Sequence, residues 1–271
     1  MPLAITHSAL SDVGRRRSHN EDRYCTDTTL GLFIVCDGMG GSKAGEVASA
    51  LAVETIHQHI NKASQHYDLP LIGPTNPNVS SSTNRLASAL REANHAIYNQ
   101  ANRTPEWAGM GTTVVATLLT DQLLSFAHVG DSRLYLIRAQ AIQPLTTDHS
   151  WVAEQVRSGL MTEAEAERSP RRNMVTRALG VEPAVEVTVR ETELYAGDLL
   201  LLCSDGLTRD IHAKTILQTL THIDDMSSAA QHLIALANDA GGEDNITVIA
   251  IAVHDAAEHT MWHRVRQRLA M

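Results

Sequence analysis

Apolar runs that end abruptly in an aspartate constrain this chain more than any other feature. Residues 32–36 are apolar and are followed at once by Asp37, with glycines at positions 38, 40 and 41. This pattern predicts a buried strand that ends in a tight loop. A carboxylate fixed at a strand end can hold a hard cation, and glycines let a main-chain carbonyl turn toward the same ion. An ordinary strand followed by an Asp-Gly turn would give the same local pattern.

Similar patterns recur at three places far apart in the sequence. Residues 199–203 form a second apolar run before Ser204-Asp-Gly206, and Asp244 comes just before the apolar run that starts at Ile246. Near the N-terminus, Glu21 and Asp22 precede a further short strand-like segment. Because four acidic groups stand at strand ends, the economical explanation is a single acidic cluster at one end of a sheet.

Six motifs together resemble one known family. They have the order and rough spacing found in the metal-dependent serine/threonine phosphatases of the protein phosphatase 2C (PPM) family: Arg17-x-x-Asn-Glu-Asp22, Asp37-Gly-Met-Gly-Gly41, Gly111-Thr-Thr113, Val129-Gly-Asp-Ser-Arg133, Ser204-Asp-Gly206 and Gly242-Glu-Asp-Asn245. The resemblance covers roughly residues 3–253, and the Asp-Gly-Met-Gly-Gly form resembles the bacterial branch.

The resemblance implies an α+β fold, an antiparallel β-sandwich flanked by helices on both faces in four α-β-β-α layers. It also implies one phosphatase domain over residues 1–254, with a flap segment at 148–180 beside the active site. The C-terminal tail at 255–271 lies beyond the resemblance, and we expect it to be helical, as a surface helix or a partner contact. Hydrophobic periodicity agrees with this architecture. It predicts strands at 3–10, 22–27, 31–36, 114–119, 123–129, 134–138, 185–189, 198–203 and 246–253, and helices at 43–60, 83–102, 149–158, 162–168, 213–221 and 227–240, with a long connection at 61–82.

The same resemblance implies two divalent ions, Mn²⁺ or Mg²⁺, and a third, weaker metal position. Asp37 would bridge the two ions and the carbonyl of Gly38 would bind one of them, while Asp205 and Asp244 would bind the other. Asp131 is either a turn former or a ligand of the third ion, and the resemblance favours the ligand. Carboxylates, carbonyls and waters are the ligands that these ions prefer.

Other residues would act around the metals. Arg17 matches the arginine that grips the substrate phosphate in the family, a task that suits its planar fork of donors. Glu21 and Asp22 would hold metal-bound waters, and Asn245 would orient the start of the last strand. Three further arginines in the flap, Arg171, Arg172 and Arg177, are weaker candidates for attracting a phosphorylated segment.

The implied reaction is hydrolysis of phosphoserine and phosphothreonine in proteins by a metal-activated water, with Arg17 and Asp37 as catalytic residues. Many eukaryotic members have a histidine, proposed as the general acid, where this chain has Met39. Methionine cannot serve as that acid, so a metal-bound water or His149 would have to protonate the leaving group. A catalytically inactive scaffold and a hydrolase of small phosphoesters are the alternative hypotheses.

Composition bounds the partners and the compartment. The formal net charge of −9 argues against a nucleic-acid surface. No apolar stretch approaches the ~20 residues of a membrane helix, and the N-terminus does not resemble a signal peptide. Cys25, Cys36 and Cys203 lack metal-type spacing and are expected to be buried thiols in a reducing cytoplasm. A monomer is expected, with phosphorylated proteins as substrates and, by resemblance, a bacterial serine/threonine kinase as the opposing partner.

Overall fold

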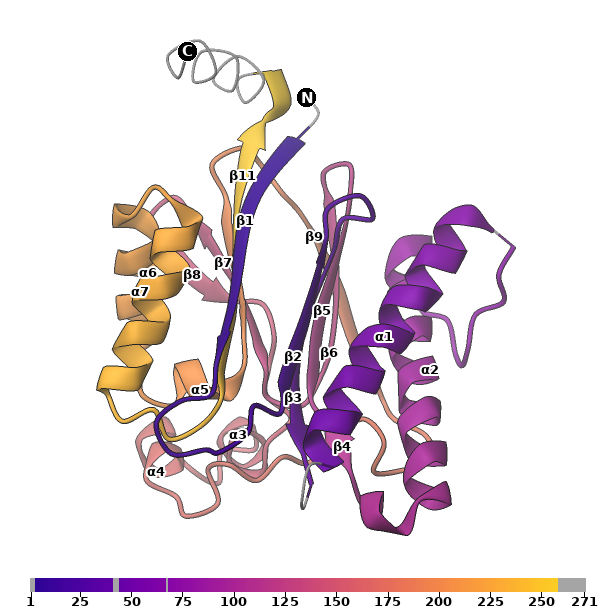
Figure 1. The fold of residues 1–271 in the computed structure, drawn as a ribbon. Helices are drawn as coiled ribbons and strands as arrows, with labels where there is room; N and C mark the ends of the chain where they lie inside the picture. The colour runs from indigo at the N-terminus through magenta and orange to yellow at the C-terminus, as the bar shows by residue number, and fades with distance from the viewer. Residues whose placement is uncertain (1–2, 41–43, 67, 258–271) are drawn as a thin grey trace.

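Two antiparallel sheets face each other in the computed structural model, which describes residues 3–40, 44–66 and 68–257 (Figure 1). The first sheet has the order β1 (Leu3–Asp12), β11 (Ile246–Asp255), β10 (Leu199–Cys203), β7 (Arg133–Arg138) and β8 (Ala141–Pro144). The second has the order β2 (Asp22–Asp27), β3 (Leu32–Met39), β5 (Val114–Thr120), β6 (Leu123–Val129) and β9 (Thr188–Glu193), and β4 (Gly111–Thr112) pairs with β3.

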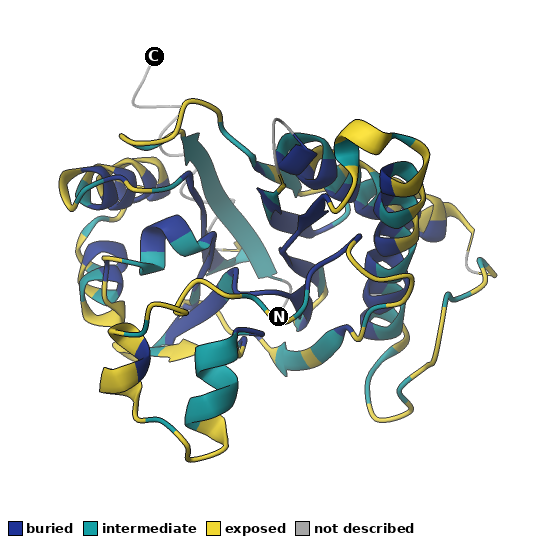
Figure 2. Cartoon of the chain, turned by 90° about the horizontal axis from the view of Figure 1, so that it is seen from below, coloured by how far each residue is buried: buried dark blue, intermediate teal, exposed yellow. Residues whose placement is uncertain are grey.

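Long helices cover the outer faces of both sheets, which confirms the predicted four-layer α+β fold. Helices α1 (Ala44–Gln65) and α2 (Ser81–Arg103) pack on the second sheet, and α6 (Ala213–His222) and α7 (Met226–Asp239) lie on the side of the first. Seen from below in Figure 2, both sheets lie between these helix layers. The predicted stripe of Leu86, Leu90 and Ile97 is fully buried and anchors α2.

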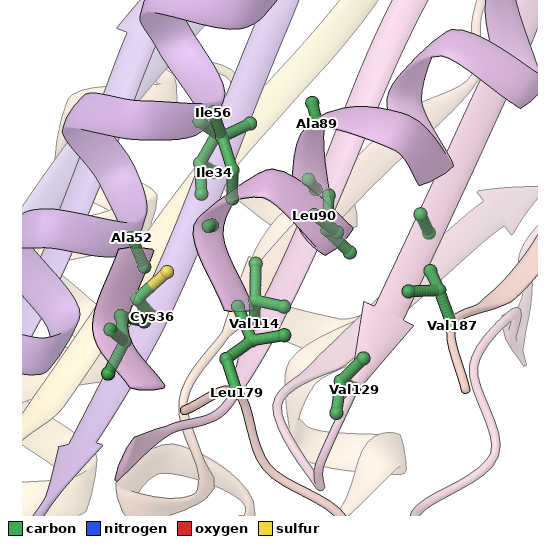
Figure 3. Close-up of a cluster of buried hydrophobic side chains, with 14 of the residues drawn as sticks. Ile34, Cys36, Ala52, Ile56, Ala89, Leu90, Val114, Val129, Leu179 and Val187 are labelled. Carbon is green, nitrogen blue, oxygen red and sulfur yellow. The ribbon is translucent and has the colours of Figure 1, made fainter. Parts of the chain in front are cut away.

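Strand β3 is buried on both faces because successive side chains point to opposite sides of the sheet. Phe33 and Val35 belong to the core between the two sheets, whereas Ile34 and Cys36 belong to the core under α1 and α2. Figure 3 shows Ile34 and Cys36 beside Ala52 and Ile56. This double burial explains why the segment has no polar alternation, and it fixes the strand that carries Asp37.

Most of the predicted helices and strands are confirmed. They differ from the structure where contacts between distant segments set the bounds of an element. The strand predicted at 185–189 is wrong in position, because pairing with β6 places β9 at Thr188–Glu193. Strand β8 was missed, since its turn uses Ala139 and Gln140 at φ 49° and 61°, where no glycine marks it. The connection predicted at 61–82 is shorter, because α1 continues to Gln65 and Ser80 caps α2.

The segment predicted as a flap contains α3 (Trp151–Arg157) and α4 (Glu163–Glu167), close to the two predicted polar helices. An isolated β-bridge pairs Ser150 with Val175 within this segment. A second bridge pairs Leu179, near the C-terminal end of the segment, with Thr112. Two further short elements are η1 (Pro105–Trp107) and α5 (Asp205–Thr208). The predicted tail at 255–271 lies outside the described residues except for 255–257. Gly41 and Lys43 also lie outside them.

No helix in the described ranges has the length and apolar character needed to cross a membrane. All three cysteines are free, and Cys36 and Cys203 are buried as expected. Cys25 is only half-buried, because its side of β2 is partly open at the edge of the second sheet.

Close packing at Gly38 gives a first prediction. A Cβ on Gly38 would lie 2.1 Å from the carbonyl oxygen of Gly45 and 2.7 Å from that of Glu21. Gly38→Ala should therefore lower the free energy of unfolding by about 3 kcal/mol, measured by urea denaturation. Gly109→Ala is the matched control, since a Cβ there meets nothing within 4 Å and only the positive φ of 77° opposes it. The control should lose about 1 kcal/mol. Equal losses of stability in the two variants would contradict this prediction, because they would show that the backbone around Gly38 shifts to accommodate the Cβ.

Candidate active site

The acidic residues predicted at strand ends meet at one end of the two sheets. Asp22 starts β2 and is the direct cross-strand partner of Asp37, near the end of β3. Asp205 follows β10 as the first residue of α5, and Asp244 lies just before β11. In the sequence these groups are separated by up to 222 positions, whereas the sheets bring them together.

The carboxylates are close enough to repel one another. Burial, and then the charges of Asp22 and Asp205, raise the pKa of Asp37 well above its usual range. Burial also raises the pKa of Asp22 to about 7 and that of Asp131 to about 7, with Asp205 adding to both. The site therefore favours whatever supplies positive charge, which is protons, cationic side chains or metal ions.

A single serine hydroxyl joins the two sheets at this site. Ser204 Oγ donates to Asp22 Oδ2 at 2.7 Å and accepts the Thr247 backbone N–H at 3.0 Å. The other carboxylate oxygen, Asp22 Oδ1, is buried with no hydrogen-bond partner among the described residues. The sequence prediction included the Ser204-Asp-Gly206 motif but gave the serine no role.

Threonines clamp the backbone of Asp37. The Thr113 N–H and the Thr112 hydroxyl donate to the Asp37 carbonyl at 2.8 and 2.9 Å. Thr113 Oγ1 accepts the Asp37 N–H at 3.2 Å and lies 2.6 Å from the hydroxyl of Ser132. The Gly111-Thr-Thr113 motif thus fixes the main chain around Asp37 and connects it to the loop that carries Asp131.

Asn245 pins the loop that carries Arg17. Its Oδ1 accepts the Glu21 N–H at 2.8 Å, and its Nδ2 donates to the carbonyls of Val13 and His19 at 3.0 and 2.9 Å. The Glu21 carbonyl in turn accepts the Gly38 N–H at 3.2 Å. These bonds tie the N-terminal loop to β11 and to β3.

Two guanidinium groups contact the carboxylates. Arg17 Nη2 lies 2.9 Å from Asp244 Oδ2, and Arg209 Nη2 lies 2.8 Å from Asp205 Oδ2 and 3.0 Å from Asp244 Oδ2. Arg209 was not predicted. Its position four residues after Asp205 could have indicated an ion pair between the two side chains. That spacing brings side chains together only in a helix, and the sequence did not predict α5.

Comparison with known proteins identifies the family. The family model described as "Protein phosphatase 2C" matches residues 14–244. The chain belongs to the protein phosphatase 2C family. It is 38% identical over 254 residues to the serine/threonine protein phosphatase PstP of Mycobacterium tuberculosis, covering 93% of this chain and 46% of PstP. It thus spans about half the length of that relative.

Other members match over nearly their full length. The serine/threonine phosphatase Stp of Listeria monocytogenes is 36% identical over 244 residues, covering 89% of this chain and 93% of Stp. The solved catalytic domain of PstP in complex with two manganese ions has a TM-score of 0.80 and 36% identity, with 93% of this chain and 100% of that domain covered. Stp1 of Staphylococcus aureus also has a TM-score of 0.80, at 32% identity and coverage of 93% and 96%.

The site of this family member has the donor groups that a metal pair requires. No three His, Cys, Asp or Glu side chains in the described ranges already stand in a metal-holding group. Arginine guanidinium groups instead hold Asp205 and Asp244. Two oxygens, Asp22 Oδ1 and Asp205 Oδ1, are nevertheless buried without a hydrogen-bond partner in the described part of the chain. Such oxygens, among mutually repelling carboxylates, are suited to hard divalent cations.

His149 is unsuited to the acid role that the sequence left open for it. Its ring stacks on that of His128 with centroids 4.6 Å apart. Its Nδ1 accepts the Gly130 N–H at 3.2 Å, so Nε2 carries the proton and donates to Thr188 Oγ1 at 3.0 Å. Burial and the neighbouring His128 lower the pKa of His149 to about 3, which keeps the ring neutral.

Two of the three flap arginines have local partners. Arg177 pairs with Glu186 at 3.0 Å, and the Arg171 guanidinium lies 4.9 Å from the centroid of the Trp151 ring. Arg172 is exposed. Arg171 is exposed as well, whereas Arg177 is half-buried, and electrostatic attraction of a phosphorylated segment by this flap stays a prediction.

The neutral state of His149 gives a prediction about pH. Because its folded pKa of about 3 lies below the ordinary value of 6.5, its contribution to stability is complete above pH 6.5 and is lost as the pH falls. The free energy of unfolding of the wild type should exceed that of His149→Gln at pH 7. That difference should shrink by about 2 kcal/mol by pH 5. Urea denaturation at several pH values measures it, and a constant difference would contradict a buried neutral ring.

Proposed function

We propose that this chain is a Mn²⁺- or Mg²⁺-dependent phosphatase of phosphoserine and phosphothreonine in proteins. The observation that carries this proposal is the convergence of aspartates from both sheets on one site whose charges repel each other. The relatives in the comparison are named serine/threonine phosphatases, and one was solved with two manganese ions. An inactive scaffold is disfavoured, because none of the predicted metal carboxylates is missing from the sequence.

The residues divide the chemistry among themselves. Asp37, the Gly38 carbonyl, Asp205 and Asp244 would hold the two ions, and Asp131 would hold a third, weaker one. Bound divalent ions supply the Lewis acidity that activates a water and offsets charge on the phosphoryl oxygens. The threonine clamp and the Ser204 link keep the carboxylates in place before substrate arrives, which lowers the reorganisation needed during the reaction.

Arg17 would bind the substrate phosphate. Its side chain is half-exposed and its partner Asp244 is a predicted metal ligand, so metal binding would free the guanidinium for a phosphate. Glu21 and Asp22 would hold waters of the metal shell, and Asn245 keeps Arg17 beside them. Since Met39 has no proton to give and His149 is neutral and fully hydrogen-bonded, we propose that the leaving alkoxide takes its proton from water.

Phosphorylated proteins are the favoured substrates over small phosphoesters. Two cavities, of about 440 and 720 Å³, are lined by parts of the chain other than the acidic site, such as Leu220 and Leu30 respectively. The relative PstP is named a serine/threonine protein phosphatase, which favours a phosphorylated segment of a protein over a small metabolite. We propose a cytoplasmic monomer that opposes a serine/threonine kinase, with a phosphatase domain at 1–254, the 148–180 flap beside its site and a helical tail at 255–271.

Replacing one predicted metal ligand tests the proposal. Phosphate release from a phosphothreonine peptide should rise with added Mn²⁺ and vanish with a chelator. Asp205→Asn should reduce this Mn²⁺-dependent rate by at least about a hundredfold, because it removes a charged ligand and not only an outer contact. Circular dichroism should show an unchanged fold.

Asp210→Asn is the matched control, since Asp210 is exposed close to α5. It should keep the wild-type rate. Full activity of Asp205→Asn would contradict the assignment, and turnover of a small phosphate ester without turnover of the phosphopeptide would favour the metabolite hypothesis.

A further inference from the structure

We propose that Arg209 is a built-in competitor of the divalent metal for Asp205 and Asp244, and that it sets how tightly the site binds metal. This inference rests on the proposed function of the site as a metal centre. It assigns a role to a residue that contacts two predicted ligands of the same ion and is not itself a metal ligand.

The guanidinium of Arg209 already occupies one oxygen of each of two predicted ligands. One terminal nitrogen, Nη2, bridges Asp205 Oδ2 at 2.8 Å and Asp244 Oδ2 at 3.0 Å. Asp244 Oδ2 also accepts from Arg17, and Asp244 Oδ1 accepts the Asn245 N–H at 3.0 Å. A cation that uses either Oδ2 atom must therefore displace or share the Arg209 contact, and one that uses Asp205 Oδ1 still meets the Arg209 charge on the same carboxylate.

Burial separates Arg209 from Arg17. The Arg209 side chain is 10% exposed and that of Arg17 is 50% exposed. Arg17 can turn into water at little cost, whereas Arg209 would have to break two partly buried ion pairs and leave the packing around its side chain. Its backbone is fixed as well, since its N–H donates to the Asp205 carbonyl at 2.8 Å and Leu207 in the same turn is fully buried.

The opposing charges give Arg209 different effects in the two states of the site. In the metal-free protein it offsets repulsion between carboxylates and so stabilises the fold. Toward an incoming divalent ion it is a like charge only a few ångströms away, and it occupies one oxygen of each carboxylate. Removing the charge should therefore lower the stability of the metal-free protein and raise its affinity for the metal. Removing an arginine with a purely structural role would lower the stability without raising the metal affinity.

Calorimetric titration of Mn²⁺ into the metal-free protein tests this inference. Arg209→Gln should bind Mn²⁺ about tenfold tighter than the wild type, and Arg209→Lys should stay closer to the wild type because it keeps the charge. Arg138→Gln is the matched control. It breaks an arginine–carboxylate pair with Asp198 at the opposite end of β7, and it should leave Mn²⁺ affinity unchanged.

Thermal unfolding gives a second readout that is independent of turnover. In chelator, Arg209→Gln should melt below the wild type, and saturating Mn²⁺ should raise its melting temperature by more than that of the wild type. If Arg209→Gln does not fold, Arg209→Met keeps the aliphatic packing without the charge and should show the same tighter binding. Unchanged or weaker Mn²⁺ affinity in the folded variant would overturn the role of Arg209. Absence of Mn²⁺ binding in the wild type and every variant would instead overturn the metal site itself.

Discussion

Mutual repulsion among buried carboxylates is the constraint on which the rest of this structure depends. Asp22 and Asp37 face each other across β2 and β3, and their pKa values are raised because burial and neighbouring charges disfavour ionisation. Such a cluster persists only where the surrounding structure holds it. Here the Ser204 hydroxyl, the backbone clamp on Asp37 and the guanidinium of Arg209 supply the polar contacts that oppose the repulsion.

The apolar layers supply the rigidity that these polar contacts require. Strand β3 is buried from Leu32 to Cys36, with alternate side chains in the core between the sheets and in the core under α1 and α2. A strand held on both faces cannot shift its register without moving every side chain to the wrong side. The position of Asp37 is therefore determined by packing several residues away, and a metal or a phosphate meets a site that is already formed.

Much of the fold and the site could be predicted from sequence, because strong local patterns coincide with tertiary burial. The apolar runs before Asp37 and Asp205, and the run that begins after Asp244, placed three carboxylates at strand ends correctly. Short elements escaped prediction: β8 follows a turn without glycine, α5 has a single turn, and cross-strand pairing moved β9. The contacts of Ser204 could not be predicted, since its partners come from two other strands, and the pairing of Arg209 with Asp205 has a local spacing signal only if the single turn of α5 is known to be helical. The metal roles themselves are still predictions.

The pairing of the first and last strands has a consequence for synthesis on the ribosome. Strand β1 pairs only with β11 within its sheet, from Leu3 opposite Asp255 to Asp12 opposite Ile246. A nascent chain that has completed β10 therefore still carries β1 without its partner, and it lacks Asp244. The first sheet closes, and the full set of carboxylates assembles, only after almost the whole described chain has left the exit tunnel. Contacts of such long sequence separation slow folding, so the carboxylate cluster is among the last parts of the described chain to form.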